Sequence, residues 1–191
     1  SFYRKYYHSG NCSVYISGKV TSEIIRCIED NLGSGQWGEV TEKAKTMLVP
    51  PVTTKEKRIF IEREDALQSS LKMGCFVMDR HHPDFLKARV MVTLFGGYFG
   101  SRLMSNIRED KGYTYGIGAG IVSYPETGIL TVSTEAANEY VDSIITEVYR
   151  EMDKLCNDLV PQEELEMVKN YMLGDLCRSY EGPFSLSDAW I

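Results

Sequence analysis

Residues 112–134 read GYTYGIGAGIVSYPETGILTVST and decide the fold class, because they contain two strand patterns that meet at a turn. Side chains alternate between two faces over 113–122 and again over 128–134, which is typical of half-buried strands. The segment 124–128 between them contains Pro125 and Gly128 and is typical of a hairpin loop. A hairpin joins antiparallel neighbours, so this stretch predicts an antiparallel sheet.

The remaining elements extend this hairpin into an α+β pattern. Further strands are predicted over 12–18, 58–62 and 71–77, and the last two are expected to pair antiparallel. Helical periodicity occurs over 21–33 after a Thr21 cap, over 84–95 with Asp84 as the cap, and over 101–110, 141–155 and 165–176. The order βαββαββαα predicts a mostly antiparallel sheet with helices packed on one face. The two hairpins exclude a doubly wound nucleotide fold.

Composition limits the function. The chain has 191 residues, is 43% hydrophobic and carries a net charge of −6, which fits one globular domain or two small ones. With 27 acidic against 21 basic residues, it is unsuited to phosphate backbones, so we expect no nucleic-acid partner. The sequence contains no run of about 18 apolar residues, so we expect no membrane span.

The five cysteines are widely spaced and form no Cys-x-x-Cys pair, which argues against a metal ribbon or a disulfide scaffold. We expect them to be small buried apolar residues, which favours a reducing compartment and hence the cytoplasm. They are Cys12, Cys27, Cys75, Cys156 and Cys177.

Glycines line one face of the predicted strand 113–122. Alternation places Thr114, Gly116, Gly118 and Gly120 on one face and Tyr113, Tyr115, Ile117, Ala119 and Ile121 on the other. Consecutive glycines on a face weaken a strand, so something must compensate. Two explanations stay open: a bend or bulge where a helix presses close, or a bare face that another backbone approaches.

Arg108 lies seven residues before Tyr115 and forms the most informative polar pair. Its guanidinium suits a carboxylate or carbonyl, and a tyrosine hydroxyl can donate to developing negative charge. Taken alone, the pair also fits a surface salt bridge and a packed aromatic ring.

Other candidate centres are weaker. The glycine-rich segment 94–102 lacks the Gly-Lys-Ser/Thr ending of a phosphate loop. His81 and His82 lack a third ligand at metal-binding spacing, and Cys75 lies on an apolar strand face that disfavours a thiolate. The residues alone therefore give no complete catalytic centre.

Residues 94–116, LFGGYFGSRLMSNIREDKGYTYG, resemble the signature of the C-terminal-type half of insulinase/pitrilysin-family zinc peptidases, which include the mitochondrial processing peptidase. The likeness extends to 2–8, to 82–84 and to 163–170, and so covers nearly the whole chain. Lys19 departs from the Asp that is common there in the family.

The resemblance implies two similar α+β halves that close like a clamshell around a peptide, with the zinc motif His-x-x-Glu-His in the first half. This chain has no such motif, so it is expected to be a substrate-binding, non-zinc half over 1–191 that is inactive alone. Zinc is expected in a complementary half, fused or separate. Arg108 and Tyr115 match the family's Arg and Tyr that reach the substrate, where the hydroxyl would help stabilise the oxyanion.

Alternatives remain at this point. The family also contains inert members that act as scaffolds, and an autonomous enzyme with an unrecognised site is a third hypothesis. The final segment 181–191 begins another helix, so we expect a fragment truncated at both ends, with an apolar patch exposed.

Overall fold

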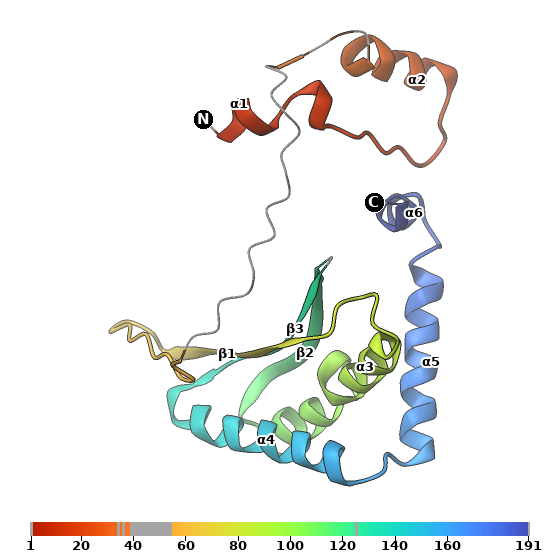
Figure 1. The fold of residues 1–191 in the computed structure, drawn as a ribbon. Coiled ribbons are helices and arrows are strands. Elements are labelled where there is room, and N and C mark those ends of the chain that lie inside the picture. Colours follow the sequence, from red (N-terminus) through yellow and green to blue (C-terminus); the bar gives the residue numbers. More distant parts are fainter. Residues whose placement is uncertain (1, 34, 36, 39–54, 125, 191) are drawn as a thin grey trace. The chain divides into compact units, whose positions relative to one another are not determined.

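A computed structural model describes residues 2–33, 35, 37–38, 55–124 and 126–190. The chain divides into two compact units, one formed by Ser1–Phe60 with Gly174–Ile191 and the other by Ile61–Leu173. The sheet and the helices packed on it belong to the second unit (Figure 1). Within the described part of the chain, every helix is too short or too polar to cross a bilayer.

The sheet has three antiparallel strands in the order β1-β3-β2. β1 is Gln68–Val77, β2 is Thr114–Tyr124 and β3 is Thr127–Ala137. The predicted hairpin joins β2 to β3, and its Pro125 lies outside the described residues. The α+β class with an antiparallel sheet is therefore confirmed.

The core lies between one face of this sheet and four helical segments on that face: α3 (Phe85–Val92), η3 (Thr93–Gly97), η4 (Met104–Asp110) and α4 (Val141–Asn157) (Figure 1). Leu103, Ile107, Ile144 and Val148 are fully buried in it. Burial of each such side chain contributes about 1.5–3 kcal/mol relative to exposure, so this layer stabilises the unit. The other core residues are Phe95, Ile117, Val132 and Ala136.

Gly96 lies where the helix after Val92 packs closely on β2. The helix widens into the π-helical η3, and Gly96 packs directly on β2. A Cβ at Gly96 would lie 2.6 Å from the Cβ of Ala119 and 2.7 Å from its backbone nitrogen. Only a glycine lets the helix approach the strand this closely.

The predicted long helices are confirmed. After η5 (Asn138–Tyr140), α4 presents its apolar stripe to the core, and α5 (Gln162–Arg178) begins directly after Pro161. The remaining helices are α1 (Phe2–Tyr6), η1 (Ser9–Asn11), α2 (Ser22–Ile28), η2 (Glu29–Gly33) and α6 (Pro183–Trp190). Thr21 caps α2 as predicted, because its Oγ1 accepts a hydrogen bond from the Ile24 amide at 3.4 Å.

Two predicted strands are wrong. Residues 12–18 and 58–62 contain alternating side chains, but neither segment pairs with a strand in the described chain. Ile59, Phe60 and Ile61 are 70%, 83% and 79% exposed. A strand requires a hydrogen-bonded neighbour as well as alternation, and the predicted pairing of 58–62 with β1 does not form.

Two further expectations are wrong, the first of them in part. Asp84 occupies the N-cap position of α3 as predicted, but its side chain makes no capping hydrogen bond: its Oδ1 instead accepts one from Lys87 Nζ at 2.7 Å, which lowers the pKa of Asp84. All five cysteines are exposed. Cys75 shows one reason: β1 is an edge strand in which every side chain is at least partly exposed.

Candidate functional site

The turn between η4 and β2 brings Arg108 and Tyr115 together. Gly112 adopts the left-handed conformation (φ +66°), and its amide donates to the Arg108 carbonyl at 3.1 Å, which ends the helix. β2 then begins at Thr114. As a result, Arg108 Cζ lies 5.5 Å from the centroid of the Tyr115 ring.

A β-bulge determines the direction of Tyr115, and here the predicted face is wrong. Thr114 pairs with Ala136 and Ile117 with Thr134, so residues 115 and 116 together oppose one residue of β3. The Thr114 hydroxyl, which is buried, donates to the Glu135 carbonyl at 2.6 Å. The extra residue shifts the alternation, so Tyr115 leaves the core face and is 91% exposed.

The glycine face of β2 is open. A Cβ added at Gly116 or at Gly120 would have no atom of the described residues within 4 Å, and one at Gly118 would meet only the Gly96 carbonyl oxygen at 3.7 Å. The helices pack on the opposite face, where Gly96 meets Ala119. Of the two explanations for the glycines, the structure therefore favours a bare face, although the strand also carries a bulge.

A hollow of about 360 Å³ lies on this open face beside Tyr115. Besides Tyr115, its lining residues are Ser70 and Lys72 of β1, Gly116 of β2, and Ser133, Thr134 and Glu135 of β3. The sequence analysis missed these β1 and β3 residues. Period-two alternation was the available signal, since Ser70 and Lys72 flank the core-facing Leu71.

Arg108 is held by aromatic rings. Its Cζ lies 4.6 Å from the centroid of Phe99 and 5.5 Å from that of Tyr115, within the range of cation–π contacts. Within the described chain no carboxylate forms an ion pair with Arg108. Among the described residues, Arg108 therefore forms no salt bridge and Tyr115 is not packed in the core. The contact between Arg108 and Phe99 was not predicted from the sequence.

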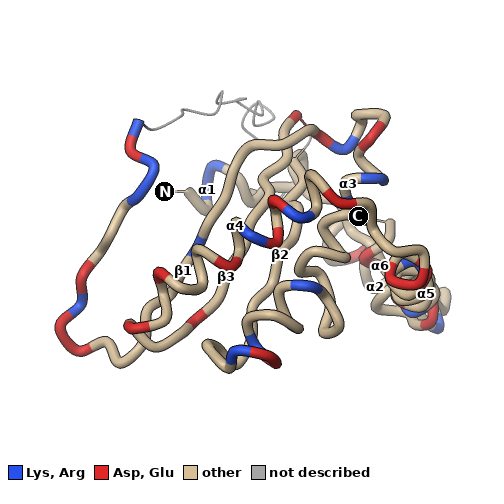
Figure 2. The backbone as a smooth tube through the Cα atoms, turned by 90° about the horizontal axis from the view of Figure 1, so that it is seen from below, with Lys and Arg blue, Asp and Glu red and all other residues tan. Residues whose placement is uncertain are grey.

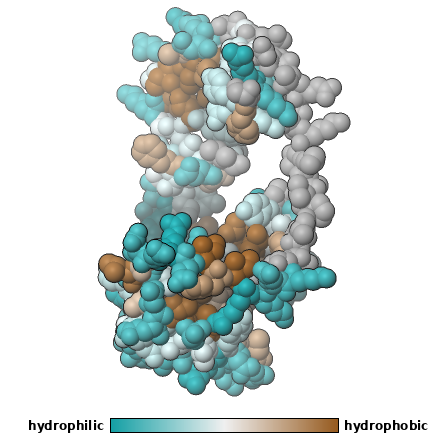
Figure 3. Space-filling model, turned by 90° about the vertical axis from the view of Figure 1, so that its left-hand side faces the viewer, coloured by the Kyte–Doolittle hydropathy of each residue, from teal (hydrophilic) through white to brown (hydrophobic). Residues whose placement is uncertain are grey.

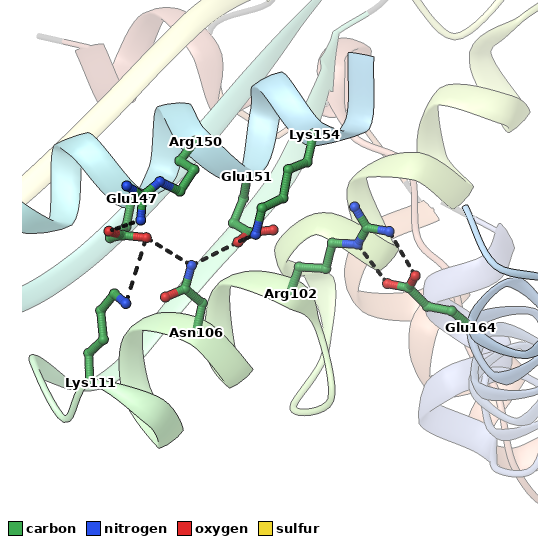
Figure 4. Close-up of polar contacts among 8 residues, drawn as sticks. All are labelled: Arg102, Asn106, Lys111, Glu147, Arg150, Glu151, Lys154 and Glu164. Carbon is green, nitrogen blue, oxygen red and sulfur yellow. Dashed lines mark hydrogen bonds and ion pairs between the residues drawn. The ribbon is translucent and has the colours of Figure 1, made fainter. Parts of the chain in front are cut away.

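A buried polar network fixes the helix that carries Arg108 (Figure 4). Asn106 Nδ2 donates to Glu147 Oε2 at 3.0 Å and to Glu151 Oε1 at 2.8 Å. The two glutamates are only 8% and 4% exposed. Their charges are balanced by Lys111, Arg150 and Lys154 at 3.9, 3.0 and 2.7 Å. Basic and acidic residues are interspersed along α4 (Figure 2).

A second set of contacts joins the segment before η4 to α5. Arg102 makes a bidentate pair with Glu164, at 2.7 Å from Nε and 2.8 Å from Nη2 (Figure 4). These hydrogen bonds raise the pKa of Arg102. Tyr98 stacks on Tyr171 with centroids 4.8 Å apart, and burial, assisted by the charge of Glu164, raises the pKa of Tyr98.

The histidines of the loop before α3 form no metal centre with the other described residues. His82 Nδ1 accepts a hydrogen bond from the Asp84 amide at 3.1 Å, in the loop before α3. Among the described residues there is no group of three or more His, Cys, Asp and Glu that could hold a metal ion.

Comparisons with known proteins converge on one family. Residues 1–172 match the family model described as "Peptidase M16 inactive domain". A Bacillus subtilis (strain 168) protein, "Uncharacterized zinc protease YmxG", is 25% identical over 176 residues. The match covers 92% of this chain, which spans only 42% of that relative's length.

Solved structures agree. The peptidase M16 inactive domain from Pseudomonas fluorescens superposes with a TM-score of 0.55 at 27% identity, covering 57% of this chain and 27% of that one. A protease from Helicobacter pylori covers 91% of this chain and 43% of its own with a TM-score of 0.71. At 16% identity, the second likeness concerns the fold alone.

Proposed function

Because this chain belongs to the peptidase M16 inactive domain family, we propose that it is the non-catalytic, substrate-binding half of a zinc-dependent endopeptidase. The zinc is held by a complementary half, in the same chain or in a separate subunit, and the two halves close on a peptide. Relatives named as zinc proteases and the lack of a metal-ligand group among the described residues support this division of roles.

The observation that carries the proposal is the position of Arg108 and Tyr115 beside an open sheet face. The guanidinium is near the exposed phenol, and no described carboxylate neutralises it. The glycines next to them leave room for a peptide backbone to approach. In this arrangement Arg108 binds a carboxylate or carbonyl of the peptide, and the Tyr115 hydroxyl donates to the scissile carbonyl oxygen as negative charge develops.

The far end of the open face offers an apolar row that a partner half can cover. Phe76, Ile129 and Val122 stand side by side across the three strands, and Phe76 and Val122 are 47% and 46% exposed. Hydrophobic residues also reach the surface of each unit (Figure 3). Contiguous exposed apolar surface on a soluble protein commonly marks an interaction site.

Tyr115→Phe tests the assigned role in the full protein with its zinc-bearing half. Loss of one oxyanion donor should lower kcat by about 10²–10³, with little change in KM. Tyr124→Phe is the matched control, since Tyr124 is half exposed at the other end of the same strand and should keep full activity.

Equal turnover of wild type and Tyr115→Phe would refute the role of Tyr115. A zinc-loaded, assembled protein that cleaves no member of a peptide library would instead favour the inert structural subunit that the sequence left as an alternative.

A further inference from the structure

Phe99 is an exposed aromatic residue whose position packing does not explain. It is 62% exposed and lies outside the hydrophobic core. Its ring nevertheless makes the shorter of the two aromatic contacts with Arg108, at 4.6 Å against 5.5 Å for Tyr115. Among the described residues, the guanidinium of Arg108 is therefore the main partner of the Phe99 ring.

The turn that carries Phe99 is anchored on both sides. The Ser101 amide donates to the Tyr98 carbonyl at 3.1 Å, which closes a tight turn with Phe99 and Gly100 in its centre. Before the turn, Tyr98 stacks on Tyr171 of α5; after it, Arg102 pairs with Glu164 of the same helix. Phe99 is thus held at a defined place although its own side chain is largely in solvent.

Stacking orients an arginine without consuming its donors. A ring contacts the flat face of the guanidinium, whereas a carboxylate partner would occupy the N–H groups in its plane. Arg108 has no described carboxylate partner, so these donors remain available at the edge of the plane. The ring also restricts the rotamers of a long side chain, so that less freedom is lost when a ligand binds.

We propose that Phe99 is a positioning residue that holds the Arg108 guanidinium so that its edge faces a carboxylate of the peptide. The inference rests on the proposed function for the identity of the ligand. The favoured substrates then carry an acidic side chain or a free C-terminal carboxylate within reach of Arg108, and Phe99 acts on binding rather than on the chemical step.

Phe99→Leu in the full protein with its zinc-bearing half is the test. The variant removes the ring but keeps an apolar side chain at an exposed site. With a peptide that carries the carboxylate, KM should rise about two- to fivefold, the weight of an exposed cation–π contact, and kcat should not change. The same peptide with that carboxylate amidated should show no difference between variant and wild type.

Rescue and controls separate this role from a structural one. Phe99→Trp should restore or lower the KM, because tryptophan is the best cation–π partner. Phe60→Leu is the matched control: this phenylalanine is 83% exposed and makes no ring or cation–π contact among the described residues, so the variant should not alter KM.

The outcomes distinguish the two proposals. If Arg108→Ala abolishes the preference for the carboxylate peptide but Phe99→Leu leaves it intact, the positioning role of Phe99 is wrong and the proposed function stands. Equal losses in Phe99→Leu and Phe99→Trp would also overturn it. If Arg108→Ala leaves the preference intact, the role of Arg108 in substrate binding fails.

Discussion

Asn106→Ala should lower the free energy of unfolding of this chain by about 2–3 kcal/mol. The substitution removes two hydrogen bonds, to carboxylates that are only 8% and 4% exposed. Each bond to a charged group contributes about 1.5–3 kcal/mol, so their full loss sets an upper limit of about 3–6 kcal/mol.

The expected loss is smaller than that limit for two reasons. Glu147 keeps Arg150 at 3.0 Å, and Glu151 keeps Lys154 at 2.7 Å. Both glutamates also line a hollow of about 590 Å³, from which water can replace the amide. The remaining loss of unfolding free energy arises because the carboxylates of Glu147 and Glu151 no longer share the Asn106 amide as a hydrogen-bond donor.

Urea-induced unfolding followed by far-UV circular dichroism measures this difference, from the shift in midpoint at constant slope. Asn157→Ala is the matched control: this asparagine lies on α4, the helix of Glu147 and Glu151, and also donates from Nδ2 to two oxygens, but both belong to exposed Asp153. A loss below about 0.5 kcal/mol for Asn106→Ala, or an equal loss in both variants, would refute the reasoning.

Three further changes test other parts of the structure. Gly96→Ala should cost about 1–3 kcal/mol of unfolding free energy by overpacking against β2, while Gly120→Ala, with open space around it, should be nearly neutral in the same denaturation assay. Arg102→Lys keeps the charge but loses the bidentate pair with Glu164, and should cost about 1–2 kcal/mol, whereas Arg178→Lys at an exposed single contact should cost almost nothing. Burial raises the folded-state pKa of Tyr98 above 10.0, so the unfolded chain releases this proton first and stability falls as the pH rises through that range. Tyr98→Phe should therefore show a shallower loss of stability between about pH 9 and 11 than the wild type.

Local signals predicted the parts of the fold that local chemistry determines. The hairpin and the Thr21 cap depend on residues close in sequence, and so does the periodicity of the helices over 141–155 and 165–176. Arg108 and Tyr115 come together because one glycine turn separates η4 from β2. The seven-residue spacing therefore corresponds to two side chains that lie close together in the structure.

The wrong predictions depend on distant partners. Whether 12–18 and 58–62 become strands is decided by a neighbouring strand, which alternation alone cannot supply. The bulge places two residues of β2 opposite Glu135, which lies 21 residues after Thr114 and accepts a hydrogen bond from its hydroxyl. Phe99 sits in a glycine-rich segment in which nothing distinguishes it from Tyr98, and only its contact with Arg108 reveals a role.

The bulge determines which residues at the start of β2 face the core. An unbroken ladder would turn the phenol of Tyr115 toward Leu103 and Ile107 and leave the hydroxyl of Thr114 in water. That reversal applies to a strand of the present length: deletion of Gly116 would also remove the bulge, but it would leave Thr114 opposite Ala136 and Tyr115 opposite Glu135, so both side chains would keep their faces. The outward position of the phenol is therefore a property of the strand register rather than of any single side chain.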